Sequence, residues 1–212
     1  MLFRSQQLWQ QKLVLAALGA RYLLAHVSNI EAIALTGSVA WGDVQADDDL
    51  DYLIITTEKR VFTVRWGCFW QAHKMGKKRR FGKERDSWCL NLFLSTKSLY
   101  IPTTKQSRFG AYQLLRLRPL YDPHYYCQQL LDINMRWIKK TMPPHYRFNK
   151  NILPKAILAD FQLTVKKELL QGKWGDLVER VLFYVQWLYQ RRRQTREVIN
   201  QQQIFFHPLL RE

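Results

Sequence analysis

The segment 35–56, LTGSVAWGDVQADDDLDYLIIT, constrains the fold more than any other part of the chain. Apolar, partly β-branched residues at its two ends favour buried strands, and a Gly-Ser step followed by acidic residues lies between them. We therefore expect a strand, a tight turn, the first turn of a helix, a polar loop and a second strand. These parts cover, in order, residues 30–36, 37–38, 39–42, 43–48 and 50–57.

Asp49 and Asp51 lie two positions apart at the start of the second predicted strand, so both side chains point to one face. Two adjacent carboxylates repel each other unless a cation lies between them, and Mg²⁺ prefers such oxygen ligands. A merely solvated loop does not account for Asp51, because a lone carboxylate inside an apolar strand is costly to bury. We expect a metal site at these two residues. The other acids of the loop are expected to be solvated: Asp43, Asp47 and Asp48.

The turn at Gly37 and Ser38 supplies groups that bind anions. A glycine between a strand and a helix lets backbone N–H groups approach a phosphate closely, and the serine hydroxyl adds a donor. A phosphate-binding turn beside a metal site is typical of nucleotidyl or phosphoryl transfer.

These residues resemble the signature of the DNA polymerase β-type nucleotidyltransferase superfamily, and in particular its solitary bacterial members. The likeness rests on Gly37-Ser38, a ten-residue spacer, Asp49 and Asp51 around Leu50, and the apolar strand that follows, and it covers residues 31–95. It implies an α/β (α+β) fold with a small mixed sheet flanked by helices. It also implies an NTP whose phosphates Gly37 and Ser38 hold, with Mg²⁺ or Mn²⁺ at the catalytic Asp49 and Asp51.

The chain departs from the superfamily at its third carboxylate, which lies on a later strand. The strand predicted over residues 88–95, WCLNLFLS, places Asn91 at that position. Asparagine offers a neutral oxygen that ligates a cation weakly or positions a hydroxyl, but it takes no proton at neutral pH. We expect Asn91 to orient the metal or the acceptor in the active site. A buried, hydrogen-bonded structural asparagine is the alternative.

Three interpretations of this departure stay open. In the first, the protein transfers nucleotides with a reduced metal site, and another group takes the proton of the acceptor. In the second, Glu84 or Asp86 replaces the missing acid because its loop folds inward. In the third, the domain binds nucleotides without catalysing transfer.

A net charge of +16, from 33 Lys and Arg against 17 Asp and Glu, predicts attraction to polyanions. Seven of these cations lie between residues 74 and 85, in a Gly-containing loop before the third predicted strand. We expect this loop to contact phosphates of a nucleotide or of a nucleic-acid backbone, and a merely solvated loop is the alternative. The residues expected to bind the nucleotide are Lys77, Lys78, Arg79 and Arg80.

The cysteines, Cys68, Cys89 and Cys127, are far apart and odd in number, which argues against a disulfide framework and a structural zinc site. We expect them to be small buried hydrophobic residues. No apolar run reaches the length of a membrane span, and we therefore expect a soluble, cytoplasmic protein without membrane contact.

Helical spacing dominates outside the predicted strands. Residues 5–27 and 59–74 are expected to be helices, as are 109–117, 125–141 and 154–193, the last with a break at 172–175. We expect residues 1–102 to form a nucleotidyltransferase-like catalytic domain and 103–212 a helical region packed on it, with the apolar tail 204–210 folded back. Aromatic residues at helical spacing are expected in the core rather than stacked on bases: Trp66, Phe69, Trp70, Trp137, Phe183, Tyr184 and Trp187.

Together these features predict a metal-dependent nucleotidyltransferase that binds an NTP and transfers a nucleoside monophosphate to an acceptor. The candidate acceptors are an RNA or DNA end, a protein hydroxyl and a small molecule, and the charge favours nucleic acid. Two alternatives stay open. One is a catalytically degenerate nucleotide- or RNA-binding protein, supported by the missing third acid, and the other is an antitoxin-like regulator that modifies a partner protein.

Overall fold

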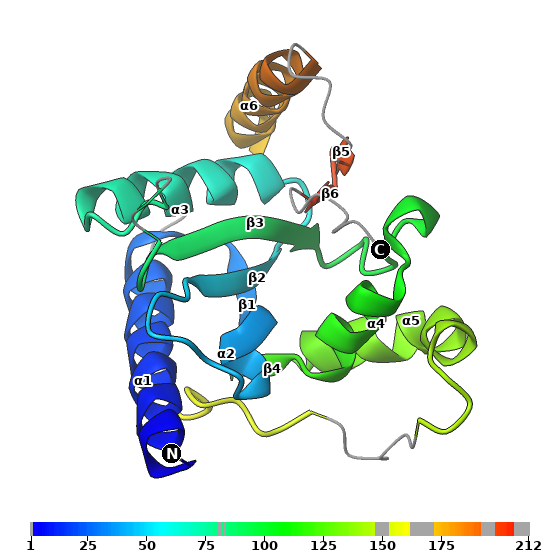
Figure 1. The fold of residues 1–212 in the computed structure, drawn as a ribbon. Coiled ribbons are helices and arrows are strands. Elements are labelled where there is room, and N and C mark those ends of the chain that lie inside the picture. Colours follow the sequence, from blue (N-terminus) through cyan, green and yellow to red (C-terminus); the bar gives the residue numbers. More distant parts are fainter. Residues whose placement is uncertain are drawn as a thin grey trace.

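The computed structural model describes residues 2–79, 82, 84–146, 153–161, 172–191 and 198–205. Within these ranges a six-stranded sheet, in the order β4-β1-β2-β3-β6-β5, forms the centre of the molecule (Figure 1). β2 and β3 are parallel, and all other neighbouring strands are antiparallel. The strands are β1 (Ile30–Leu35), β2 (Leu50–Thr56), β3 (Trp88–Ser95), β4 (Arg118–Tyr121), β5 (Val198–Asn200) and β6 (Gln203–Phe205).

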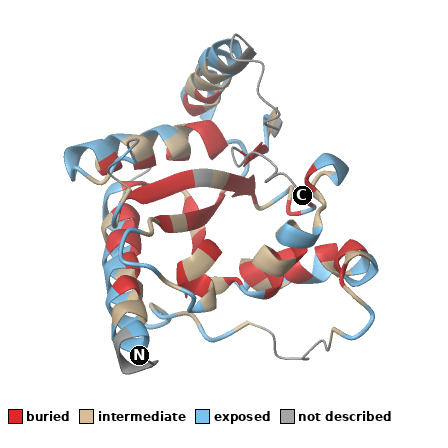
Figure 2. Cartoon of the chain, viewed as in Figure 1, coloured by how far each residue is buried: buried red, intermediate tan, exposed pale blue. Residues whose placement is uncertain are grey.

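Helices cover both faces of this sheet, which confirms the mixed α+β class (Figure 1). α1 and α3 pack with Tyr52 and Ile54 of β2 in one core, while α4 and α5 pack with Leu53 and Ile55 in another. Alternation of side chains along β2 therefore builds two cores from one strand. Figure 2 shows the buried residues on the sheet and on the inner sides of the helices. The helices are α1 (Leu2–His26), α2 (Gly37–Trp41), α3 (Val61–Lys74), α4 (Arg108–Leu115), α5 (Tyr126–Thr141) and α6 (Gly172–Arg191), with a 3₁₀ turn at Thr103–Lys105.

A glycine brings α1 close to the sheet. A side chain at Gly19 would collide with the Tyr52 hydroxyl and the Trp88 indole. The Tyr52 hydroxyl donates a hydrogen bond of 3.0 Å to the Ala16 carbonyl, so the buried phenol is satisfied by the backbone of α1. No helix in the described part of the chain is long and apolar enough to cross a membrane.

The expectation of helices throughout the second half missed three strands. β4 contains Pro119 and lies at the edge of the sheet, where the missing N–H of proline is tolerated. β6 pairs with β3 and buries Ile204 and Phe205, which confirms that the tail folds back as far as these residues; residues 206–212 lie outside the described ranges. Residues 153–161 form turns rather than a helix, and α6 begins at Gly172, where a break was expected. The boundary near Pro102 stays a prediction.

The start of α3 is completed by a carboxylate from α6. No side chain at the N-cap position caps α3. The Glu179 carboxylate instead accepts hydrogen bonds of 2.8 Å from the backbone N–H groups of Phe62 and Thr63, and one of 2.6 Å from the Thr63 hydroxyl. Arg60 and Asp176 add an ion pair of 2.9 Å between the same elements. The first turn of α3 thus depends on α6 for partners that its own sequence lacks.

The aromatic residues expected in the core divide into two groups. Trp137 is buried, and Phe69 and Phe183 pack against the core. The expectation was wrong for the remaining four, which are exposed to solvent: Trp66, Trp70, Tyr184 and Trp187.

Candidate metal and nucleotide site

The predicted metal ligands lie at one end of three neighbouring central strands, β1, β2 and β3. β1 is antiparallel to β2, so the end of β1 lies beside the start of β2, and the parallel strand β3 starts there as well. In this register Asp51 is directly opposite Cys89. Ligand atoms of Asp49, Asp51 and Cys89 all lie within 4.8 Å of one another. The topology therefore brings together the two carboxylates that the spacing predicted and a thiol that it did not.

The turn that follows β1 presses against Asp51. Gly37 has a left-handed backbone conformation with φ of +69°, and a side chain there would collide with the Asp51 carboxylate. The Thr36 N–H donates a hydrogen bond of 2.9 Å to the Asp51 carbonyl. The left-handed conformation favours glycine at this position, and any side chain there would displace the Asp51 carboxylate. The predicted phosphate-binding turn is thus adjacent to the predicted metal ligands.

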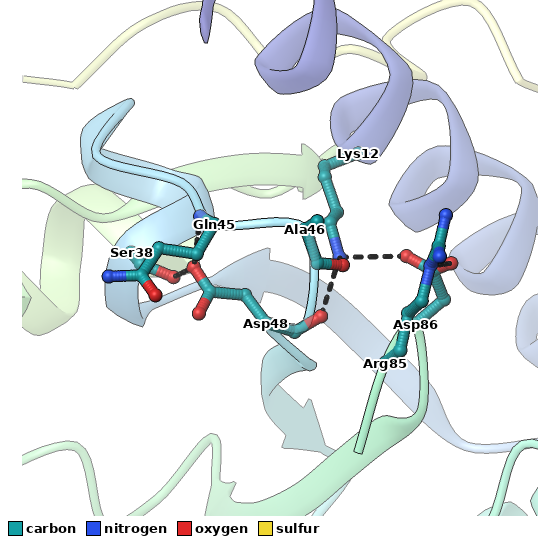
Figure 3. A network of polar contacts seen from close by, with 7 residues as sticks. All are labelled: Lys12, Ser38, Gln45, Ala46, Asp48, Arg85 and Asp86. Atoms are coloured by element: carbon teal, nitrogen blue, oxygen red, sulfur yellow. Dashed lines mark hydrogen bonds and ion pairs between the residues drawn. The ribbon is translucent and has the colours of Figure 1, made fainter. Parts of the chain in front are cut away.

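Ser38 and Asp48 organise the acidic loop (Figure 3). The Ser38 hydroxyl donates a hydrogen bond of 2.6 Å to Asp48 Oδ2, and the Gln45 N–H donates one of 2.9 Å to the same oxygen. The expectation that Asp48 is merely solvated was wrong, because its carboxylate closes the loop as a local acceptor. Asp43 and Asp47 are exposed, as expected.

Lys12 of α1 holds the acidic loop in place through hydrogen bonds (Figure 3). Its side chain is 2% exposed, and its Nζ donates to the Ala46 carbonyl at 3.0 Å, the Asp48 carbonyl at 2.6 Å and Asp86 Oδ1 at 2.9 Å. Three acceptors satisfy the three ammonium hydrogens, which makes burial of the charge tolerable. Sequence reasoning missed this residue. Its one signal was a lysine next to the apolar stretch of a predicted helix.

These contacts also bear on the search for a third acid. Asp86 Oδ1 is held by Lys12 at 2.9 Å and its Oδ2 lies 3.6 Å from Arg85 Nε, so both carboxylate oxygens already contact cations. Glu84 lies 3.4 Å from Arg79 Nη2, and its charge adds slightly to the rise in the pKa of Asp49 that burial and Asp51 cause. Of the two acids weighed from the sequence, the structure places Glu84 within electrostatic reach of the cluster.

Arg79 is the cation of the cluster. Its Nε lies 3.1 Å from Asp49 Oδ2, and its Nη1 donates to Cys89 Sγ at 3.7 Å. Asp49 Oδ2 is buried and accepts no hydrogen bond from any described residue, so its contact with Arg79 is an ion pair without hydrogen-bond alignment. Partial burial lowers the pKa of the Arg79 guanidinium, but the contributions of Asp49, Cys89 and Glu84 together outweigh it, so the pKa is raised.

The rest of the predicted basic segment follows the start of β3. The Trp88 N–H donates a hydrogen bond of 2.7 Å to the Lys77 carbonyl, and Lys78 forms a parallel bridge with Trp88. This pairing carries the chain from the end of α3 to the carboxylates. Lys77 is half-buried and Lys78 is exposed, while Arg80 lies outside the described residues.

A register shift interrupts the pairing of β2 with β3 directly after Cys89. Between the pairs Asp51–Cys89 and Leu53–Leu92, two steps along β2 match three along β3. Asn91 belongs to this irregular part of β3, and its side chain lies outside the described residues, so its role stays a prediction. Strand alternation alone does not reveal a bulge, whereas the register puts Cys89 opposite Asp51.

Burial and neighbouring charge raise the pKa values of two groups in the cluster, Asp49 and Cys89. Burial, together with the charge of Asp51, raises the pKa of Asp49 to about 6, although Arg79 lowers it in part. Burial and the neighbouring Asp51 also raise the pKa of Cys89, which is a free and buried cysteine like the other two. The thiol therefore stays protonated at neutral pH.

These groups fit a hard divalent cation. Asp49 and Asp51 offer carboxylate oxygens, and one of those oxygens is buried without a hydrogen-bond donor among the described residues. Mg²⁺ or Mn²⁺ takes such ligands and completes its shell with water or phosphate oxygens. The protonated thiol of Cys89 is a poor ligand for Mg²⁺, so the protein's own ligands for that ion are the two carboxylates.

Comparison with known proteins adds little to this geometry. No protein-family model matches the sequence, and no curated protein is significantly similar to it. Among solved structures, a chain from a crystal structure of a toxin-antitoxin with AMP-PNP is 14% identical, with 58% of this chain and 85% of that chain covered and a TM-score of 0.36. At that score the likeness carries no argument about fold or activity. The function is therefore argued from the site.

Proposed function

We propose that this protein is a metal-dependent nucleotidyltransferase that binds an NTP and moves its nucleoside monophosphate to an acceptor. The observation that carries the proposal is the convergence of Asp49, Asp51 and Cys89 within 4.8 Å, beside a turn in which Gly37, with a left-handed backbone, lies against the Asp51 carboxylate. A pair of carboxylates with one raised pKa, next to an anion-binding turn, is an arrangement with few purely structural uses.

Asp49 and Asp51 would hold Mg²⁺ or Mn²⁺. When bound, such an ion neutralises phosphate oxygens and orients the phosphate for attack by the acceptor. The turn at Gly37 would present backbone N–H groups to the triphosphate, and the Ser38 hydroxyl would exchange the Asp48 carboxylate for a phosphate oxygen. Arg79 would move from Asp49 to the triphosphate, because both are anions and Asp49 is then engaged by the metal.

The proton of the acceptor needs a base that Asn91 does not provide. We propose Glu84 for this role, because it lies 3.4 Å from Arg79, the same arginine that contacts Asp49. Asp86 is the weaker choice, since Lys12 holds it at 2.9 Å.

The test is a transfer assay with labelled ATP, CTP, GTP and UTP, Mg²⁺ or Mn²⁺, and total RNA as a pool of acceptors. The double variant Asp49→Ala/Asp51→Ala is expected to abolish label transfer. Asp43→Ala/Asp47→Ala removes the same charge from exposed positions of the same loop and is expected to retain it. Transfer by the double variant at Asp49 and Asp51, or equal loss in the control, would contradict the proposal.

A second candidate, a nucleotide-binding protein without transferase activity, is favoured by one observation. Arg79 already contacts Asp49 at 3.1 Å, so a cation is present at the cluster without a metal. This candidate predicts NTP binding that survives the loss of Asp49 and Asp51, measured by calorimetry, together with no transfer by the wild-type protein under any metal.

A further inference from the structure

Two tryptophans are exposed on the outer face of α3. The side chains of Trp66 and Trp70 are 59% and 53% exposed, and they lie one helical turn apart. His73 and Lys74 continue the same face and are exposed as well. In Figure 2 the side of α3 that points away from the sheet is drawn largely in the colour of exposed residues. Two large aromatic side chains that are adjacent on a helix surface and exposed to solvent indicate a binding surface rather than part of the core.

The chain segment that contains these rings carries Lys and Arg but no acid; the acids Asp176 and Glu179 of α6 lie at the first turn of α3. Residues 59–83 contain nine Lys and Arg and no Asp or Glu. Lys74 Nζ lies 5.7 Å from the centre of the Trp70 ring, and the His73 ring lies 6.3 Å from it. A cation and an aromatic face thus occur together at one point of the surface. Flat rings bordered by cations complement the bases and phosphates of a nucleic acid, whereas a hydrophobic protein partner would not need nine cations and no acid.

The face leads directly into the candidate site. After α3 the chain passes through Lys77 and Lys78, which lie beside Trp88 at the start of β3, and then to Arg79 at Asp49. A strand lying along α3 would therefore have its end next to the carboxylates.

We propose that this face of α3 binds single-stranded nucleic acid, with bases stacked on Trp66 and Trp70 and phosphates at Lys74, Lys77 and Lys78. A single strand fits because its bases expose their flat faces, which a duplex hides between its own base pairs. RNA and DNA share this chemistry. Binding does not depend on transfer; only the use of the bound strand as an acceptor rests on the proposed function.

The experiment measures fluorescence anisotropy of labelled oligo(U) and oligo(dT) 12-mers on the full chain, at 50 and 200 mM salt. Trp66→Ala/Trp70→Ala is expected to weaken binding by about tenfold or more, because two stacking surfaces are lost. Trp66→Phe/Trp70→Phe is expected to recover most of the affinity, since phenylalanine still stacks. Lys77→Ala/Lys78→Ala is expected to weaken binding and flatten its salt dependence. The two oligonucleotides distinguish RNA from DNA.

Trp174→Ala is the matched control, because Trp174 is a tryptophan that is 75% exposed on a different helix, α6. It is expected to leave affinity unchanged. Affinity within twofold of wild type for the Trp66/Trp70 alanine variant overturns the proposal and leaves the face to a protein partner. An equal loss in the Trp174 variant, or equally tight binding of a duplex, also overturns it. Circular dichroism confirms that each variant is folded.

The inference and the proposed function fail separately. Asp49→Ala/Asp51→Ala is expected to bind the oligonucleotides as wild type does and to transfer no nucleotide. If the wild-type protein binds single strands through its two tryptophans but transfers no nucleotide from any NTP, the binding proposal is supported and the proposed transferase activity is contradicted.

Discussion

Replacement of Asp49 by asparagine is expected to make the folded protein more stable at neutral pH. Burial and the charge of Asp51 raise the pKa of Asp49 from 3.8 to about 6, even though Arg79 Nε lies 3.1 Å away. The folded protein therefore holds this carboxylate less favourably than the unfolded chain does. Asparagine keeps the shape of the side chain and removes the charge, so it relieves this cost.

The magnitude follows from the size of the shift. A rise of about two pKa units corresponds to ~3 kcal/mol for a fully enclosed group. The side chain of Asp49 keeps 16% exposure, so solvent screens part of the interaction and we expect about 1–2 kcal/mol. A charged residue whose removal stabilises the fold is typical of a functional site.

The same pKa shift fixes the sign of the pH dependence. Because the pKa of Asp49 is higher in the folded state, the folded protein binds a proton between pH 4 and 6 that the unfolded chain has lost (both limits approximate, from 3.8 and about 6). The titration of Asp49 therefore lowers the free energy of unfolding of the wild type as pH rises through that window. The advantage of Asp49→Asn is therefore complete above about pH 6 and absent below about pH 4.

The assay is urea unfolding of the wild type and Asp49→Asn at pH 7.5 and pH 4.0. Asp47→Asn, which removes an exposed carboxylate from the same loop, is the control and is expected to have no effect. Millimolar Mg²⁺ is expected to raise the unfolding midpoint of the wild type and not that of Asp49→Asn. A destabilised Asp49→Asn at pH 7.5, or an advantage that persists at pH 4.0, would refute the reasoning.

Three further predictions concern residues outside the carboxylate pair. Lys12→Met leaves two carbonyls and one carboxylate without their donor, and is expected to cost about 2–3 kcal/mol in urea unfolding and to weaken Mn²⁺ binding in calorimetry. Asn134→Ala removes four hydrogen bonds from a fully buried amide and is expected to cost about 3 kcal/mol in the same unfolding assay, without changing Mn²⁺ affinity. Glu179→Ala removes the cap of α3 and is expected to cost about 1–2 kcal/mol, with faster amide exchange at Phe62 and Thr63 by NMR.

Local pattern was sufficient to predict the framework of the site. The apolar runs that became β1 and β2, the turn at Gly37 and the paired acids Asp49 and Asp51 are all readable within residues 30–56, because strand alternation and turn chemistry act over short distances. Pro119 in β4 was not readable in this way. A strand containing proline is acceptable only at a sheet edge, and the position of a strand within a sheet is a property of the whole fold.

The parts of the site that escaped prediction depend on contacts between distant segments. Lys12 reaches the acidic loop across 34 residues or more, and Cys89 faces Asp51 through the pairing of β2 with β3, which α3 separates along the chain. The outward position of Trp66 and Trp70 has a different cause. α3 has apolar residues on both faces. The face that includes Val64, Cys68 and Ala72 packs in the core with the sheet, while Trp66 and Trp70 lie on the other face. Periodicity identifies the two faces but does not say which of them is buried.

A comparison within the protein bears on what the carboxylate pair is for. The ion pair between Arg60 and Asp176 joins α3 to α6, and the hydrogen bond from Arg60 lowers the pKa of Asp176. The Asp49 carboxylate also has an arginine at 3.1 Å, yet its pKa stays raised. Burial is the largest cause of this rise and the charge of Asp51 adds to it, whereas the side chain of Asp176 is more exposed than that of Asp49. One guanidinium therefore does not offset burial together with the excess negative charge that Asp49 and Asp51 bring to this confined place. A structural ion pair would have no reason to carry that excess. A site that binds a divalent cation needs it, because the charge left unbalanced in the free protein is the charge that the metal neutralises when it binds.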